Sequence, residues 1–483
     1  MPQPIYFRPS DGWAGDVIPF AHGDRVNLFY LHDRRDPSKP GTSWNLYTTT
    51  DYAEYEYQEV GLPHGTTADQ DLNAYTGSIV EHDGVMHLFY TGVNPAFLIP
   101  GTSDPAQVVM HATSTDGMQT WIKHPQHTFG APAGYDPLDW RDPFVFKPER
   151  DGPWHMLLAA RSTEGPSRRR GLIADCLSTD LITWKVTTPF WAPGRYITHE
   201  CPEVFQIGDW WYLVFSEFSD HFVTRYRMAR SPFGPWQVPA RDTIDGRAFY
   251  AGKSAELGGA RHFTGWIPTR EGETDDGAWQ WAGDFAAHEA VQASDGTLDI
   301  RMPVALRESF AWPVVPGFLP VLGDWQVSDN RWHLDVPDAY GVTVAPDAPD
   351  QFLLQATIEV GENTTEVGVI LRSSADGDEG YLIRLEPRAG RLVFDRWPRA
   401  VTGPGQWQVS GDISHLVELE RPIEIAPGTH QLSIIVDGTA CVAYLDDKVA
   451  MSARIYDRRG GGVGLFVGEG TATFTDVSIA TRQ

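Results

Sequence analysis

Three carboxylate residues, Asp16, Asp142 and Glu200, have side chains suited to acid and base chemistry. They lie in the segments GWAGDVIPF, WRDPFVF and HECPEVF, each at the polar start of an apolar run. A single Asp before Pro usually marks only a turn. Together, however, two carboxyl groups can cleave a glycosidic bond, one protonating the leaving oxygen while the other attacks the sugar or activates water, and a third can bind hydroxyls.

Each acid begins one copy of a repeated sequence unit, and the fold of that unit determines where the acids lie. Five segments share a polar opening, an apolar run, a Gly or Asp turn and a second apolar run, and their opening residues are Asp16, Ser78, Asp142, Glu200 and Ser254. The openings are roughly 60 residues apart, which suits one four-stranded antiparallel blade with its loops. Helical periodicity is scarce in this half of the chain. We therefore predict an all-β fold in which residues 1–310 form a five-bladed β-propeller catalytic domain.

Inner strands line the central channel of a propeller, so we expect the five opening residues at equivalent positions around it. Carboxylates gathered there repel one another, and burial further disfavours their ionised forms. Such clusters are retained for chemistry or for a cation, although acids that merely cap turns remain the alternative. No clustered histidines or calcium-loop spacing accompany them, so we expect neither a metal nor a cofactor.

Composition limits the classes of partner. The 483 residues carry 38 Lys and Arg against 64 Asp and Glu, a formal net charge of −26. That charge disfavours nucleic acid and anionic membranes and favours a small neutral substrate. Three separated cysteines predict no disulfide framework or zinc site, and the absence of a leader or apolar span predicts a cytoplasmic protein. Oligomeric state is not predicted.

The motifs GWAGDVIPF, WRDPFVF and HECPEVF, in this order and spacing, resemble glycoside hydrolase family 32, the invertase, inulinase and levanase group. The segments AYTGS, FYAGKS and FTGWIPT are similar to further signatures of the family. The resemblance implies that Asp16 is the nucleophile, Glu200 the general acid/base, and Asp142 the stabiliser that holds sugar hydroxyls. The expected substrate-binding residues are Trp13, His32, Tyr75, Ser78, Arg141, His199 and Trp266.

The chain also departs from the family pattern. The usual Asn-Asp-Pro-Asn motif is replaced around Gly15 and Asp16, and Leu31 stands where a Gln is common. The usual Pro-Arg-Glu has become Ala287, His288 and Glu289. Because several sugar-contacting groups are missing while the acids remain, the type of reaction is predicted more firmly than the substrate.

A Pro- and Gly-rich segment, 311–322, is predicted to link the propeller to a second domain. Residues 323–483 contain alternating apolar and polar runs typical of an antiparallel β-sandwich; the clearest runs are 352–360, 366–374, 381–387, 390–397, 430–438 and 440–447. We interpret this domain as a structural partner of the propeller, with carbohydrate binding as the alternative.

The predicted function is a retaining glycoside hydrolase that removes terminal β-D-fructofuranosyl units from sucrose or short fructans through a covalent intermediate. Three alternatives remain. The same fold could transfer the fructosyl group to a sugar, forming oligofructosides or difructose anhydrides. It could be an inverting, arabinofuranosidase-like hydrolase. It could also be a sugar-binding propeller without catalysis, which the release of fructose from sucrose or inulin would exclude.

Overall fold

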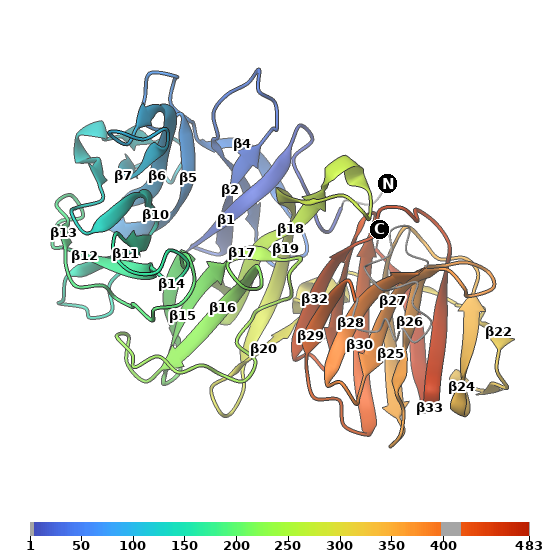
Figure 1. Cartoon of the computed structure of the whole chain (residues 1–483). Helices are drawn as coiled ribbons and strands as arrows, with labels where there is room; N and C mark the ends of the chain where they lie inside the picture. The colour runs from blue at the N-terminus through green and yellow to red at the C-terminus, as the bar shows by residue number, and fades with distance from the viewer. Residues whose placement is uncertain (1–3, 398–416, 483) are drawn as a thin grey trace.

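The computed structural model describes residues 4–397 and 417–482. Nearly all regular structure in these residues is β-strand; the exceptions are α1 (Val304–Glu308) and the short 3-10 turns η1 (Pro125–His127) and η2 (Glu271–Glu273). Figure 1 shows the propeller, coloured blue to yellow, beside the sandwich, coloured mainly orange and red. The predicted all-β fold, a five-bladed propeller followed by a sandwich, is confirmed.

Each blade is an antiparallel sheet in which consecutive strands pair, except that β9 of blade 2 pairs with β7. The strands are β1 (Trp13–His22), β2 (Arg25–Asp33), β3 (Trp44–Thr49) and β4 (Glu56–Leu62) in blade 1; β5 (Asn73–His82), β6 (Val85–Leu98), β7 (Pro105–Ser114), β8 (Ile122–Lys123) and β9 (Phe129–Gly130) in blade 2; β10 (Tyr135–Phe146), β11 (Trp154–Ser162), β12 (Gly171–Ser178) and β13 (Lys185–Val186) in blade 3; β14 (Glu200–Ile207), β15 (Trp210–Glu217) and β16 (Val223–Ala229) in blade 4; and β17 (Tyr250–Leu257), β18 (Ala260–Arg270), β19 (Trp279–Gln292) and β20 (Leu298–Arg301) in blade 5.

Two features complete the ring of blades. Blade 4 has only three named strands, and isolated bridges from Arg225 to Thr243 and from Met228 to Gln237 extend its outer edge. Blades 1 and 5 are joined where β1 pairs with β19 at Ala14 and Gly283. This pairing closes the ring and brings segments more than 250 residues apart against each other.

The second domain is a sandwich with a large apolar core that includes Phe352, Val369 and Phe474. Its strands are β21 (Trp312–Val314), β22 (Leu319–Leu322), β23 (Gln326–Ser328), β24 (Arg331–Ala345), β25 (Gln351–Val360), β26 (Glu366–Ser373), β27 (Gly380–Glu386), β28 (Arg391–Trp397), β29 (Leu419–Pro422), β30 (Gly428–Asp437), β31 (Ala440–Leu445), β32 (Val449–Arg454) and β33 (Gly462–Thr481). The long strand β33 pairs with β24, β25 and β26 and so connects both parts of the sandwich.

The segment predicted as a linker takes part in the sandwich. Strand β21 pairs with β33, and β22 pairs with β24. Regular pairing of the second domain therefore begins at Trp312, before the predicted boundary at residue 323. Pro313 and Pro320 fit these short strands because edge strands tolerate a missing backbone donor.

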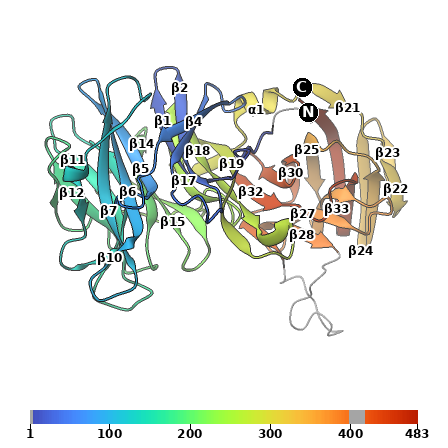
Figure 2. The same ribbon diagram turned by 90° about the horizontal axis from the view of Figure 1, so that it is seen from above.

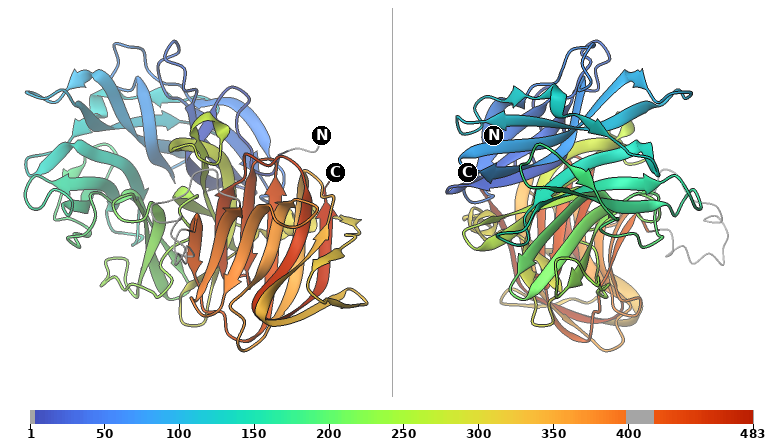
Figure 3. Two further views of the ribbon diagram at one scale, coloured as in Figure 1. Left: turned by 45° about the vertical axis from the view of Figure 1, so that its right-hand side comes forward. Right: turned by 90° about the vertical axis from the view of Figure 1, so that its left-hand side faces the viewer.

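The two domains share one apolar interface. A single buried cluster contains Tyr6 and Phe249 from the propeller together with Ile435, Val442 and Tyr444 from the sandwich. Strands β18 and β20 of blade 5 contact sandwich strand β32, and Figure 2 shows blade 5 beside the sandwich. The N- and C-terminal ends lie close together near this junction in both views of Figure 3. Such a shared core holds the domains in one arrangement.

Candidate active site

The inner strand of every blade carries a break in its pairing register. The breaks fall between Ala14 and Val17, Tyr75 and Gly77, Arg141 and Phe144, Glu200 and Glu203, and Tyr250 and Lys253. Such β-bulges leave residues unpaired and redirect side chains, and they are common beside active sites. Asp142, Cys201 and Ala251 occupy matching bulge positions with φ of 58°, 50° and 53°.

We expected the five opening residues at equivalent positions of the blades. This expectation is wrong, because they differ in their positions relative to the bulges. Asp16 and Asp142 lie within their bulges, whereas Glu200 immediately precedes its bulge. Ser78 and Ser254 lie beyond theirs and pair regularly with the next strand. The three acids therefore occupy different positions relative to the bulges of their own strands.

Hydrogen bonds between neighbouring blades hold the acids. Asp16 accepts from Thr76 Oγ1 at 2.6 Å and from Trp266 Nε1 at 2.9 Å. Asp142 accepts from the Cys201 amide at 2.9 Å, and its own amide donates to Thr91 Oγ1 at 2.8 Å. Each carboxylate is thus positioned by residues from an adjacent blade.

Glu200 is held at both carboxylate oxygens. Arg141 Nη2 donates to Oε1 at 3.0 Å, and the Tyr250 hydroxyl donates to Oε2 at 2.5 Å. The Arg141 Nε atom also lies 3.9 Å from Asp142 Oδ2, so one guanidinium joins two of the acids. Arg141 is fixed in turn by hydrogen bonds to Gln107 and Asp139. The two charges in the segment WRDP therefore belong to one network around the site.

Burial raises the pKa of all three acids, and their mutual repulsion adds to the effect. The Thr76 and Trp266 hydrogen bonds oppose this rise at Asp16, and the Arg141 charge opposes it at Asp142 and Glu200. Glu200 keeps 20% of its side chain exposed, against 5% for Asp142. The more open Glu200 is suited to exchange a proton with a ligand.

Four of the predicted binding residues surround these acids. Tyr75 directly precedes the bulge of blade 2, Arg141 bridges Asp142 and Glu200, and Trp13 is half-buried three residues before Asp16. Trp266 is fully buried and donates to Asp16. Because it is buried, Trp266 is better placed to orient Asp16 than to contact a sugar.

The other three predicted binding residues are buried in the protein. His32 contacts Asn45 and Asp11, and the Ser78 hydroxyl accepts from the Val145 amide at 3.0 Å. His199 is fully buried against Trp191, Tyr196 and Phe215, and burial lowers its pKa to about 3. These surroundings give His32, Ser78 and His199 structural contacts and leave little surface for a ligand.

Sequence reasoning missed several residues that complete the site. Thr76, Cys201 and Tyr250 bond the acids directly. Lys253 is almost fully buried, and its ammonium donates to the Gly77 carbonyl at 2.8 Å, next to Thr76. This cation lowers the pKa values of Asp16 and Asp142. Its place in FYAGKS, directly before the repeat opening Ser254, is the signal that the sequence offers.

Metal binding and membrane insertion also bear on the setting of the site. Within residues 4–397 and 417–482, no group of three or more His, Cys, Asp or Glu side chains is arranged to hold a metal ion. No helix in the described part of the chain combines the length and apolar character needed to cross a bilayer.

The family comparison decides the class of protein. The model of the glycosyl hydrolases family 32 N-terminal domain matches residues 6–299, and that of the family 32 C-terminal domain matches residues 331–481. The chain belongs to glycosyl hydrolase family 32. The predicted family is confirmed, and the protein is a glycoside hydrolase.

Individual relatives match along almost the whole family 32 chain. Raffinose invertase of Escherichia coli is 25% identical over 98% of this chain and 93% of its own length. Levanbiose-producing levanase of Bacillus subtilis (strain 168) is 22% identical over 98% and 89%, respectively. The exo-inulinase structure from Aspergillus awamori has a TM-score of 0.73 and 17% identity, with 100% and 99% coverage. That structural likeness supports the fold.

Proposed function

We propose that this family 32 enzyme removes terminal β-D-fructofuranosyl units from sucrose or short fructans and retains the configuration of the sugar. The convergence of Asp16, Asp142 and Glu200 carries the proposal, because it provides a nucleophile, a stabiliser and an acid in one cluster. The similar raffinose invertase and levanase support a fructose-containing substrate. The substrate is a small neutral carbohydrate.

The first chemical step forms a glycosyl-enzyme ester. An oxygen of the Asp16 carboxylate attacks the anomeric carbon while the bond to the leaving oxygen breaks and Glu200 supplies its proton. Thr76 and Trp266 hold Asp16 in a fixed direction for this attack.

The second step regenerates the enzyme. Glu200 accepts a proton from water, and the water oxygen attacks the anomeric carbon and displaces the Asp16 carboxylate. Asp142 hydrogen-bonds sugar hydroxyls in both steps, and Arg141 keeps its carboxylate near that of Glu200. Two displacements on the same carbon leave the product with the configuration of the substrate.

Incubation with sucrose and with inulin, followed by NMR during the first minutes, tests the proposal. Free fructose of retained configuration is expected, and added methanol should be captured as a methyl fructoside. Fructose of inverted configuration without methanol capture would assign the enzyme to the inverting, arabinofuranosidase-like mechanism. Dominant formation of oligofructosides or difructose anhydrides would instead show a transferase.

A further inference from the structure

The inner strand of blade 3 has a second break in its pairing register. Besides the bulge that holds Asp142, the pairing of β10 with β11 is interrupted between Tyr135 and Trp140. In the described residues, each of the other four inner strands shows a single break against its neighbour. Asp136 and Asp139 lie in the second break of β10. Because residues in such a break are redirected, both carboxylates can face the same neighbour.

Oppositely charged side chains alternate from this break toward the acid site. Arg170 Nη2 and Arg161 Nη1 lie 3.9 Å and 4.0 Å, respectively, from Asp136 Oδ2. Arg161 Nη1 also donates to Asp139 Oδ2 at 2.9 Å, and Arg141 Nη1 donates to Asp139 Oδ1. We call these five residues the blade 3 ion-pair network. Its innermost member is the guanidinium that joins two acids of the site.

The inner part of the network is shielded from water. The exposed fraction of the side chain falls from 24% at Asp136 to 14% at Arg161 and 9% at Asp139. Charges that lie away from water are screened less, whereas exposed ion pairs contribute little. Asp139 and Arg161 are therefore the members with the strongest effect on Arg141.

Asp139 competes with the acids of the site for the charge of Arg141. This guanidinium donates to Glu200 at 3.0 Å through Nη2, while its Nη1 donates to Asp139. Burial lowers the pKa of Arg141, but the charges of Glu200, Asp139 and Asp142 outweigh burial and raise it. Burial raises the pKa of Glu200, and the Arg141 charge opposes that rise. A negative charge at Asp139 weakens this opposition, and the positive charge of Arg161 restores part of it.

The remaining titratable groups that face Glu200 lie outside the network. They are Asp142 of β10, Asp16 of β1, Tyr250 of β17 and the thiol of Cys201. The charge of Asp142 raises the pKa of Glu200, and the Tyr250 hydrogen bond lowers it. Burial raises the pKa of the Cys201 thiol and keeps it neutral. Changes at the outer members of the network leave all four groups in place.

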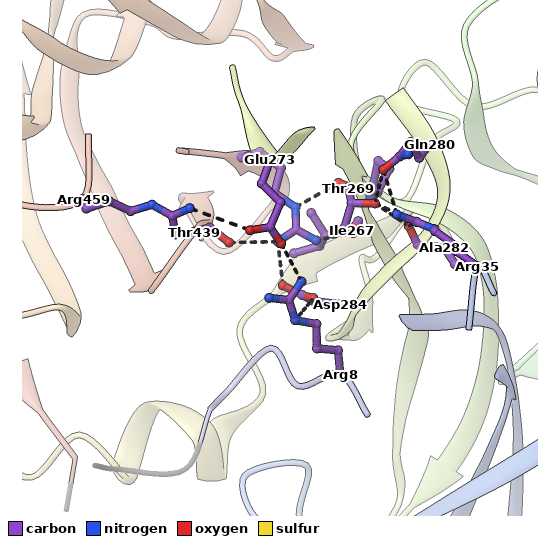
Figure 4. A network of polar contacts seen from close by, with 12 residues as sticks. Arg8, Arg35, Ile267, Thr269, Glu273, Gln280, Ala282, Asp284, Thr439 and Arg459 are labelled. Carbon is purple, nitrogen blue, oxygen red and sulfur yellow. Dashed lines mark hydrogen bonds and ion pairs between the residues drawn. The ribbon is translucent and has the colours of Figure 1, made fainter. Parts of the chain in front are cut away.

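Arg35, which follows β2 in blade 1, has a different environment. It donates to Thr269 Oγ1 and to Gln280 Oε1, both at 2.7 Å, and Figure 4 shows it beside these uncharged residues of blade 5. Its carboxylate partner is Asp33, two residues away, at 3.3 Å. Arg35 thus ties blade 1 to blade 5 mainly through neutral acceptors, whereas Arg141 divides its charge among three carboxylates.

We propose that Asp139 and Arg161 are positioning residues of the reaction, which act through Arg141 to determine how readily Glu200 releases its proton. The inference rests on the proposed function for the role of Glu200 as the acid. It also gives a reason for the second break in β10. In a regular strand, residues 136 and 139 would point to opposite faces, and both acids could not lie within 4.0 Å of Arg161.

The pH dependence of kcat/KM on sucrose tests the proposal, because the two residues carry opposite charges. Asp139→Asn removes a negative charge, so Glu200 should ionise more easily and its pKa should fall. Arg161→Gln removes a positive charge and should raise that pKa. The alkaline limb, where the acid loses its proton, should therefore move by about 0.5–1 pH unit to lower pH in Asp139→Asn and to higher pH in Arg161→Gln.

Matched variants separate this effect from a structural one. Asp151→Asn and Arg150→Gln make the same charge changes in the exposed turn between β10 and β11 and should leave the limb unmoved. Arg161→Lys keeps the charge and should restore the limb of the wild type. Thermal midpoints establish which variants are folded. Loss of turnover in Asp139→Asn and Arg161→Gln without opposite shifts of the limb would refute the proposal.

A measurement without substrate separates this inference from the proposed reaction. Carbon-13 NMR of protein labelled at the glutamate carboxyl carbons, with Glu200→Gln to assign the signal, gives the pKa of Glu200 directly. A lower value in Asp139→Asn and a higher value in Arg161→Gln would support the network even if the wild type cleaved neither sucrose nor inulin, a failure that would refute the proposed function alone. An unchanged value in both variants would refute the network.

Discussion

At the scale of single residues, the three acids divide the chemistry according to their contacts. Asp16 is held by uncharged donors, chiefly Thr76 and Trp266, whereas Glu200 is held by an arginine and a tyrosine. We expect Asp16→Asn, Asp142→Asn and Glu200→Gln each to lower turnover of sucrose by at least about a thousandfold, since each removes a group used in the reaction. Steady-state rates and circular dichroism would check this. Near-native turnover in any one folded variant would remove that residue from the mechanism.

Tyr250 gives a pH prediction at the same scale. Its hydrogen bond stabilises ionised Glu200 and lowers that pKa, so Tyr250→Phe should raise it. A general acid works only while protonated, and activity falls as pH rises through its pKa. The alkaline limb of the kcat/KM profile should therefore move to higher pH in Tyr250→Phe. Tyr57→Phe, at an exposed tyrosine, is the control; an unmoved or lowered limb would contradict the role of Tyr250.

At the scale of elements, the segment before β17 is tied to β32 of the sandwich. Asp245 is buried and accepts from the Ser452 hydroxyl at 2.6 Å, from the Ser452 amide at 3.0 Å, and from His288 Nε2 at 3.0 Å. Asp245→Ala leaves these groups without their partner and should lower the free energy of unfolding by about 2–4 kcal/mol. Urea denaturation would measure the loss. Asp24→Ala, at an exposed site, should change little.

The same contacts show what the sequence could predict. Strand runs such as 352–360 and 440–447 were found because alternation is a local property. The bulges at Asp16 and Asp142 were missed, because a register break depends on the partner strand. His288 could be noted only as a departure from the family, since its partners Asp245 and Tyr444 are distant in sequence.

At the scale of the whole molecule, the sandwich completes the apolar core of the propeller. Ile435, Val442 and Tyr444 share a buried cluster with Tyr6 and Phe249. The buried Arg454 of β32 also bonds Asp284 at 2.5 Å and the Ile267 carbonyl at 2.6 Å in blade 5. The second domain is therefore part of the structural support for the strand that carries Trp266.

This shared core predicts cooperative folding. A chain ending at residue 310 would expose the apolar cluster and remove Arg454 from Asp284, so we expect it to aggregate or to unfold at a temperature well below that of the full chain. Calorimetry of the intact protein should show one transition rather than two. A soluble, active 1–310 fragment would show that the propeller is independently stable and would contradict this prediction.

The left-handed bulge residues Asp142, Cys201 and Ala251 have a consequence for protein engineering. An inner strand with regular pairing would have a lower conformational free energy. The left-handed positions therefore reduce stability while they shape the active site. Selection for heat resistance alone would favour glycine at these left-handed positions, which would relieve their backbone strain, or loss of one bulge residue, which would straighten the strand. Such changes would remove the Asp142 carboxylate or move the Cys201 amide that donates to it. Thermostabilisation of this enzyme should therefore be directed to the outer strands and the sandwich, with the inner strands left unchanged.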